Sequence, residues 1–222
     1  MNEQRKYALT AGISLLVMAV VAGFSYGYVY SSLVVADADT TIENISASIS
    51  LFIGGIIGWV FILILDVIAA LALYQFFKPT NYSVSLMTGM LRLLYTAILG
   101  VAIIQLISVV VSINSHQDAS GALNSLHSFE SFWSFGLIIF GLHLTGLGIL
   151  AKNYPHIHNV FSWLLLIAGL CYLGIHLSKV ILPNMSAQIQ QAEMILSLPM
   201  ALGELAFALW LVFKGGKIKK YK

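Results

Sequence analysis

The sequence predicts an all-helical membrane protein, a bundle of six transmembrane helices joined by short loops. Two observations lead to this fold class. First, 59% of the residues are hydrophobic and only 9% are charged, with a mean hydropathy of +0.90. Soluble domains carry about 25% charged residues, so this chain has too little polar surface to coat a soluble globule. Second, the chain contains six apolar stretches, and each is long enough, at about 20 residues, to cross a bilayer.

We expect a single transmembrane domain over residues 1–222, with a basic tail at 214–222. The expected spans lie at about 8–35, 51–77, 84–113, 131–151, 159–182 and 195–213. The first span begins with basic residues, as a signal peptide does, and Ala36-Asp37-Ala38 resembles a cleavage site. Its apolar region is about twice as long as that of a signal peptide, so we interpret it as a retained anchor.

Two connecting segments carry patterns of their own. Between the first two spans, Thr40 and Glu43 form a capping-box pattern. Isoleucines follow at helical spacing, at Ile42, Ile45 and Ile49. We therefore predict a short surface helix that leads into the second span. The segment 114–130, NSHQDASGALNSLHSFE, is polar and is predicted to be a flexible loop.

The distribution of charge predicts the orientation. Nine of the Lys and Arg residues lie in the N-terminus, the 78–83 loop, the 152–158 loop and the C-terminus, whereas the three opposite loops hold six acids and no basic residue. Because basic loops stay on the cytoplasmic side, both termini should be cytoplasmic, in a bacterial cytoplasmic membrane. The basic tail should lie against anionic lipid heads, or serve as a topology signal alone. The single cysteine, Cys171, excludes an intrachain disulfide.

Four ionisable residues lie inside the predicted spans: Asp66, Arg92, His143 and Glu204. At 1.5 Å per residue they lie about 16, 12, 13 and 15 Å from the cytoplasmic edge, in one thin slab. Small and polar residues share their helix faces, among them Tyr95 and Thr96 beside Arg92, and such faces form helix interfaces in membranes. We expect these side chains to point into the bundle, where Asp66 pairs with Arg92.

This cluster is the candidate site, a ligand- or proton-binding site made of Asp66, Arg92, His143 and Glu204 and supported by Tyr95 and Thr96. Two carboxylates face one guanidinium, which stays protonated. Neutrality then needs a charged His143 or a proton on one acid, because an unpaired buried charge is costly. The cluster is therefore expected to bind an exchangeable proton, a cation or a cationic ligand, with His143 as the titrating member. The alternative is a fixed ion network that sets helix register.

The residues around these four positions resemble a known family. They read DVIAALALYQFFKPTN, LRLLYTAILG, FGLHLTGLGIL and GELAFALWLVFKG, and contain Asp66, Arg92, His143 and Glu204 in that order. The set resembles a bacterial family of multi-pass membrane proteins, the domain-of-unknown-function family numbered forty-three eighty-six. The chain departs from it at Tyr154-Pro155-His156, where family members tend to carry a Tyr-Leu-Pro-Arg segment. The resemblance implies the architecture and no activity.

Other sites receive less support. His143 and His176 differ in depth by about 12 Å, too much for the two axial ligands of one haem. A metal site near the outer surface would draw on six residues, but interfacial packing of His176 and Lys179 is favoured. The six are His116, Asp118, His127, Glu130, His176 and Lys179. His156 and His158 fit an exposed turn better than a metal site. We expect no metal, cofactor or nucleic acid.

Three functions remain open. The first is a small binding or transport-like protein, with its site opening toward the cytoplasmic half and a possible homodimer. The second is an enzyme acting on a lipid or quinone-like substrate through His143 and an acid, for which a lateral opening would be evidence. The third is a structural or signalling subunit. The Gly54-x-x-x-Gly58 motif allows close helix approach, either inside the bundle or in a dimer.

Overall fold

The computed structural model describes residues 2–115 and 119–217, and over these residues the chain is all-helical, without strands. Helix α1 (Glu3–Ala22) continues through a π-helix, η1 (Gly23–Tyr30), into α2 (Ser31–Leu33). The short α3 (Ala38–Ala47) follows. The long helices after it are α4 (Ile49–Phe77), α5 (Tyr82–Asn114), α6 (Ala119–Asn153), α7 (Asn159–Ile181) and α8 (Ser186–Phe213), the last two joined by the 3-10 turn η2 (Pro183–Met185).

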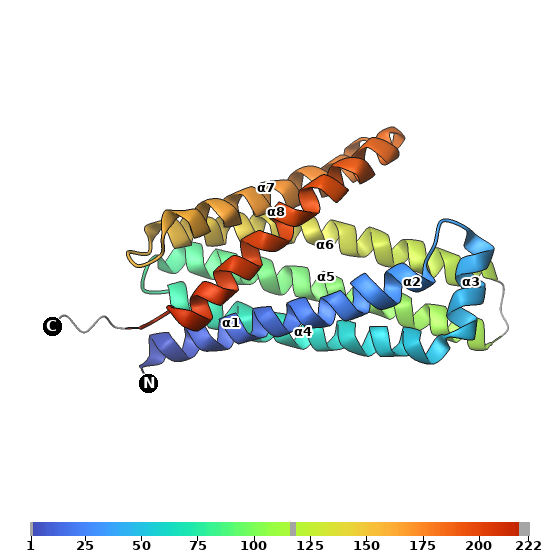
Figure 1. Cartoon of the computed structure of the whole chain (residues 1–222), viewed down its shortest axis with the longest axis horizontal. Coiled ribbons are helices and arrows are strands. Elements are labelled where there is room, and N and C mark those ends of the chain that lie inside the picture. Colours follow the sequence, from blue (N-terminus) through green and yellow to red (C-terminus); the bar gives the residue numbers. More distant parts are fainter. Residues whose placement is uncertain (1, 116–118, 218–222) are drawn as a thin grey trace.

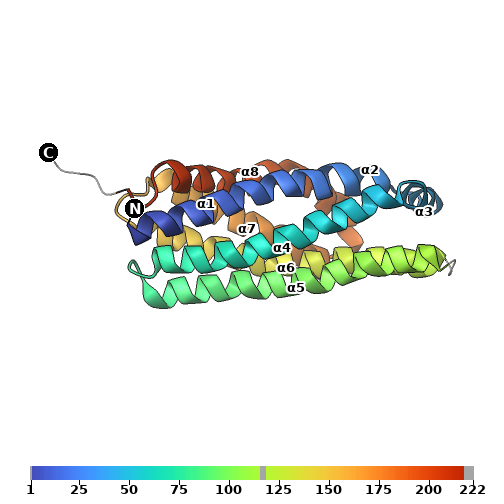
Figure 2. The ribbon, with the colours of Figure 1, turned by 90° about the horizontal axis from the view of Figure 1, so that it is seen from below.

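Six helical segments are long and apolar enough to cross a membrane: Glu3–Leu33, Ile49–Phe77, Tyr82–Asn114, Ala119–Asn153, Asn159–Ile181 and Pro183–Phe213. This confirms the predicted fold class of six candidate spans. In Figure 1 and Figure 2 the long helices run roughly parallel to one long axis. Such continuous helices are favoured in a membrane, because its core holds no water to hydrogen-bond the backbone groups.

The flexible loop predicted at 114–130 is wrong over 119–130. Helix α6 begins at Ala119, and Ala122, Leu126 and Phe129 are buried along one of its faces. Their spacing is that of an amphipathic helix, which a search for continuous apolar runs overlooks. Helix α8 likewise begins at Ser186 rather than near residue 195.

The short surface helix predicted before the second span is present as α3, but its predicted start is wrong. Asp37 is the N-cap, because its Oδ2 accepts a hydrogen bond from the backbone N–H of Thr40 at 2.8 Å. Thr40 and Glu43 therefore lie inside the helix and do not begin it. Hydrogen bonding from Thr40 lowers the pKa of Asp37, as expected for a charged cap.

The six long helices form a closed ring in which each contacts its neighbour in the chain and α8 returns to α1. Of the Gly54-x-x-x-Gly58 motif, Gly58 is packed inside this ring, whereas a Cβ atom on Gly54 would meet no atom closer than 4.0 Å. A Cβ atom on Gly58 would collide with Ser25 Oγ of η1, and one on Gly55 would lie 2.9 Å from Val29. The close approach of α4 to η1 therefore requires glycine at these positions.

Both described ends of the chain lie at one end of the bundle, which we call the terminal end. Asn2 Nδ2 donates to the Gly216 carbonyl at 3.3 Å. The loops at 78–81 and 154–158 lie at this end too, whereas α3 lies at the opposite, distal end (Figure 1). Of the residues on which the sequence analysis relied, His116, Asp118, Lys219, Lys220 and Lys222 lie outside the described part of the chain.

Helices α1 and α8 touch at the terminal end and separate toward the distal end. At the terminal end the Arg5 side chain donates to the carbonyls of Leu211 and Gly215, at 3.0 and 2.8 Å. Gly12 of α1 packs against Ala208 and Val212 of α8. In Figure 1 the upper part of α8 then rises away from α1 together with α7. This divergence positions the candidate site.

Candidate functional site

Four ionisable side chains from four helices meet in the middle of the bundle, with Arg92 of α5 at their centre. Its Nε and Nη2 atoms lie 2.9 and 2.7 Å from Oδ1 of Asp66 on α4. Its Nη1 atom lies 2.7 Å from Oε1 of Glu204 on α8 and 3.1 Å from Nε2 of His143 on α6. The structure thus brings together all four residues that the sequence proposed for the site.

The hydrogen bonds of His143 define its protonation. Nδ1 lies 2.9 Å from the carbonyl oxygen of Thr88, which can only accept, so Nδ1 carries a hydrogen. Nε2 faces the Arg92 guanidinium, which can only donate, so Nε2 must accept. The imidazole is therefore neutral, with both nitrogens engaged. This geometry does not fit the expectation that His143 is the titrating member.

The remaining charges do not balance within the cluster. With His143 neutral, the two carboxylates of Asp66 and Glu204 face the single positive charge of Arg92. The Arg92 and Asp66 side chains are only 1% and 3% exposed, whereas the Glu204 side chain is 24% exposed. Glu204 is thus the carboxylate that remains accessible from outside the cluster.

The two supporting residues have different positions. Tyr95 lines the cleft described below, and its ring centroid lies 5.0 Å from that of Phe140. Thr96 donates its hydroxyl hydrogen to the Arg92 carbonyl at 2.8 Å, a local bond within α5. Only Tyr95 therefore contacts the space around the cluster.

Glu204 owes its place to the close packing of α8 on α7. The preceding residue, Gly203, is buried against α7. A Cβ atom there would lie 2.7 Å from the Ala168 Cβ and 2.8 Å from the Leu164 carbonyl oxygen. A side chain at this position would push α8 outward and withdraw Glu204 from Arg92.

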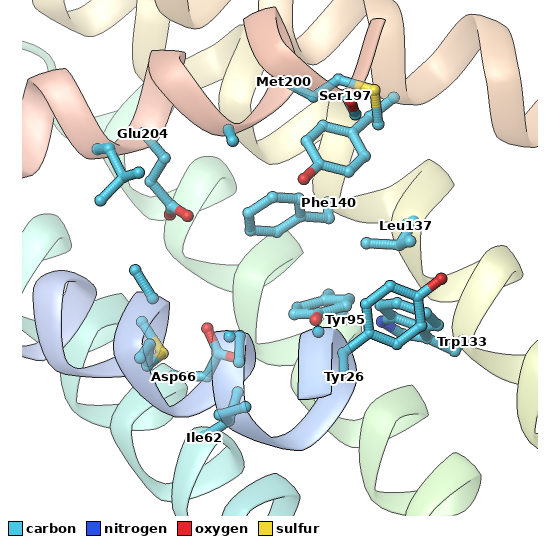
Figure 3. Close-up of a pocket in the computed structure, with 18 of the residues that line it drawn as sticks. Tyr26, Ile62, Asp66, Tyr95, Trp133, Leu137, Phe140, Ser197, Met200 and Glu204 are labelled. Atoms are coloured by element: carbon cyan, nitrogen blue, oxygen red, sulfur yellow. The ribbon is translucent and has the colours of Figure 1, made fainter. Parts of the chain in front are cut away.

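Asp66, Arg92 and Glu204 form the base of a cleft of about 670 Å³, whereas His143 is buried behind Arg92 and does not line it. Residues of all six long helices and of η1 line the cleft, from the cluster toward Gly27, His176 and Gln190 in the distal half. In Figure 3 the carboxylates of Asp66 and Glu204 point into it from opposite sides, and Ser197 and Met200 of α8 face Phe140 and Leu137 of α6. The cleft therefore extends away from the terminal end, whereas the sequence predicted an opening on the side of the termini.

Aromatic rings form one wall of this cleft. Tyr26, Trp59 and Trp133 contact one another edge to face, with Tyr26 and Trp133 centroids 4.7 Å apart. Nearer the cluster, the Phe140 ring lies edge to face with Tyr172 at 5.3 Å. The Arg92 guanidinium carbon lies 5.4 Å from the Phe140 centroid, within the range of a cation–π interaction.

Polar residues lie along the distal part of the cleft. His176 is 2% exposed; its Nδ1 lies 2.8 Å from Ser134 Oγ, while its Nε2 has no hydrogen-bond partner among the described residues. Glu193 of α8, which lines the cleft, pairs with Lys179 at 2.8 Å. Within residues 2–115 and 119–217, no three His, Cys, Asp or Glu side chains are grouped closely enough for a metal ion.

Sequence reasoning missed the contribution of the first span, which appeared only as an apolar anchor. One face of α1 and η1 lines the cleft, through Leu15, Met18, Ala19, Ala22, Gly23, Tyr26 and Gly27. The alternating steps of three and one residues are those of a single helix face. Four of the seven are alanine or glycine, a small-residue stripe that could have marked this face.

Comparisons with known proteins agree with the architecture. The model of a family described as a domain of unknown function, DUF4386, matches residues 10–215. A protein of Archaeoglobus fulgidus described as uncharacterised is 29% identical over 165 residues, which cover 74% of this chain and 86% of that protein. No solved structure matches the chain. Because the family match extends over nearly the whole chain, the protein belongs to the DUF4386 family of unknown function.

Proposed function

We propose that this protein is a small membrane-embedded binding protein whose polar cluster holds one exchangeable proton or cation at the base of the cleft. The observation that carries the proposal is the charge count around Arg92. Two carboxylates contact one guanidinium, and the third neighbour, His143, is neutral by its hydrogen bonds. The cluster is left with one negative charge.

An uncompensated charge at this depth is costly. Glu204 lies ten residues before Lys214, which places it about 15 Å from the terminal edge of the bundle. A carboxylate there gains little from water, so a proton or a cation that neutralises it stabilises the fold. Glu204 is the carboxylate that a cation can reach from the cleft, because its side chain is 24% exposed while that of Asp66 is 3% exposed.

A binding role fits this conformation better than transport does, because the cleft is closed at the terminal end. The cleft extends toward the distal end, and at the terminal end Arg5 of α1 donates to two carbonyls of α8 and to that of Gly215 just after it. Passage through the protein would require α1 and α8 to separate there, and a six-helix chain would then be expected to act as a homodimer.

The proposal predicts that thermal stability depends on pH through the two carboxylates of the cluster. The protein in detergent is melted from about pH 4.5 to about pH 9. We expect the wild-type Tm to fall as pH rises, because loss of the proton leaves an unpaired negative charge in the bundle. Glu204→Gln should remove this step, since the remaining Asp66 and Arg92 charges balance at every pH.

Two controls sharpen this experiment. Glu193→Gln removes a carboxylate from the cleft rim and should leave the step in place. His143→Gln should lower the Tm overall but keep the step, because His143 stays neutral throughout. A wild-type curve that is flat over the whole pH range would contradict the proposal and leave the cluster as a fixed network that sets helix packing.

Exposed lining residues of the cleft, Tyr26 and Met194, favour one second candidate, an enzyme that acts on a lipid or quinone-like molecule. Since both ring nitrogens of His143 are engaged, Glu204 would transfer the proton. Incubation with membrane lipid extract and with a quinol, followed by mass spectrometry, tests this candidate. Conversion by the wild type and none by Glu204→Gln would support it over simple binding.

A further inference from the structure

We propose that the cleft binds a lipophilic monocation, a hydrophobic molecule with one positive charge, and that its charged group lies against Glu204 and Asp66. This inference rests on the proposed function, because it assigns a ligand class to the same cluster. It follows from the charge at the base of the cleft, the chemistry of its walls and the side on which it opens.

The base of the cleft lacks one positive charge. The groups that face Glu204 are Asp66 from α4, Arg92 from α5, His143 from α6 and Tyr172 from α7. Helix α1 contributes Leu15, Met18 and Ala19 to the lining near the cluster, none of which titrates. Glu204 uses Oε1 to bind Arg92. The positive charge that would balance it must therefore come from a proton or from a ligand.

The walls suit a hydrophobic cation. Tyr95, Phe140 and Tyr172 lie next to the cluster, and aromatic faces attract cations strongly where water is excluded. Phe140 already lies near one cation, the Arg92 guanidinium, at 5.4 Å. Across the cleft are methionines, whose flexible thioethers adapt to apolar ligands of different shape. They are Met18, Met194 and Met200.

The size and the opening indicate a ligand that comes from the membrane. A cleft of 670 Å³ falls within the range of small-molecule sites. From Glu204 to Glu193 along α8, eleven residues span about 16 Å. The rim between η1 and α8 is formed by exposed residues of the membrane-spanning segments, including Tyr26 at 43% and Met194 at 67% exposure. A hydrophobic molecule could therefore enter from the side.

The charge count also excludes other occupants. An anionic molecule would place further negative charge beside Glu204 and Asp66. A zwitterionic phospholipid such as phosphatidylethanolamine carries a phosphate within a few ångströms of its ammonium group, so its net charge would leave the imbalance uncorrected. A molecule with a single positive charge corrects it, and competes with the proton for the same carboxylate.

The test uses tetraphenylphosphonium, a permanent lipophilic cation that neither donates nor accepts a proton. Binding of the labelled ion to the purified full chain in detergent is measured at about pH 8.5 and about pH 5, and its affinity should be at least about tenfold weaker at the lower pH. Tetraphenylborate has the same shape and the opposite charge, and should show no saturable binding.

Two variants distinguish binding of the ion in the cleft from its partition into the detergent micelle. Glu204→Gln should reduce the affinity at high pH at least about tenfold. Ala201→Trp changes no charge but fills the cleft, because Ala201 lines it, and should abolish binding. The adjacent Leu202 is 45% exposed and is not among the lining residues, so Leu202→Trp is the matched control that should bind normally.

The outcomes distinguish this inference from the proposed function. A pH-dependent Tm together with no saturable tetraphenylphosphonium binding would overturn the monocation and leave the proton site standing. A flat Tm would overturn the proposed function itself. Equal binding to wild type, Glu204→Gln and Ala201→Trp would show partition into the micelle and overturn the inference. Displacement by stoichiometric phosphatidylethanolamine would also overturn it, because the occupant would then be a lipid headgroup.

Discussion

At the scale of single residues, Arg92 organises the centre of the molecule. It is 1% exposed, yet it contacts two carboxylates and an imidazole from three other helices. A planar guanidinium suits this role because its donors point in fixed directions, so one side chain can join helices that approach from different sides. A lysine could not replace it, since an ammonium group lacks that geometry.

The first residue-scale prediction concerns the order of stability among charge variants. Arg92→Gln should cost the most, about 3–5 kcal/mol, because it leaves two carboxylates without a partner. Asp66→Asn should cost less, because Arg92 keeps Glu204. Denaturation of the purified variants measures both free energies of unfolding.

The double variant Asp66→Asn with Arg92→Gln should recover part of the sum of the two single losses. We expect a coupling energy of about 1–3 kcal/mol between the two sites. Strict additivity would mean that Asp66 and Arg92 do not interact, and an equal cost for the two single variants would contradict the charge count.

At the scale of elements, α8 controls access to the cluster. It is fixed to α1 by Arg5 and to α7 at Gly203, and it carries both Glu204 and one wall of the cleft. Across the opening lies η1, whose wider π-helical turns place Tyr26 beside Trp133. Such π-helical segments are frequent at functional sites. On these two sides the cleft is therefore bounded by a π-helical segment and by a helix that contains Pro199.

Arg5 provides the element-scale prediction. Its guanidinium donates to the carbonyls of Leu211 and Val212 near the C-terminal end of α8 and to that of Gly215 just beyond it. A cation at this position also interacts favourably with the helix dipole. Arg5→Ala should lower stability by about 1–3 kcal/mol, and Arg5→Lys should restore only part of this. Lys6→Ala, at an exposed position paired with Glu3, is the control and should change little. An equal effect of the Arg5 and Lys6 variants in thermal melts would show that the carbonyl contacts do not hold α8.

At the scale of the whole molecule, basic residues lie at the terminal end of the bundle and acidic residues at the distal end. The basic residues predicted to lie on one side are found at the terminal end wherever the structure describes them, among them Arg5, Lys78 and Lys152. Asp37 and Asp39 lie at the distal end, at the start of α3. From the positive-inside rule we expect the terminal end to lie in the cytoplasm and the distal part of the cleft to lie in the opposite half of the membrane.

This orientation is testable by cysteine labelling. In a Cys171→Ser background, a cysteine replaces either Asp39 or Lys78, both of which are exposed. A membrane-impermeant maleimide applied to intact cells should label the Asp39 variant, and the Lys78 variant only after the membrane is permeabilised. The reverse pattern would invert the protein and place the cleft mouth toward the cytoplasm.

Several parts of the site were predictable because they depend on distance along the chain. A rise of 1.5 Å per residue places Asp66, Arg92, His143 and Glu204 at one depth once their spans are known. Burial of charge in an apolar medium then predicts that they face one another. The state of His143 was not predictable, because it depends on whether Thr88 and Arg92 lie on its two sides.

The sequence by itself determined that the chain forms six long apolar helices and that the polar residues share one depth, because a bilayer leaves the backbone few alternatives to long helices. It misplaced the start of α6, where the helix continues beyond the apolar run. Only the tertiary structure decided that Arg92 lies between both acids, that α1 lines the cleft and that the cleft extends distally. These features depend on the rotation and tilt of each helix. Side-chain packing at positions such as Gly58 and Gly203 fixes that rotation and tilt, whereas hydropathy does not.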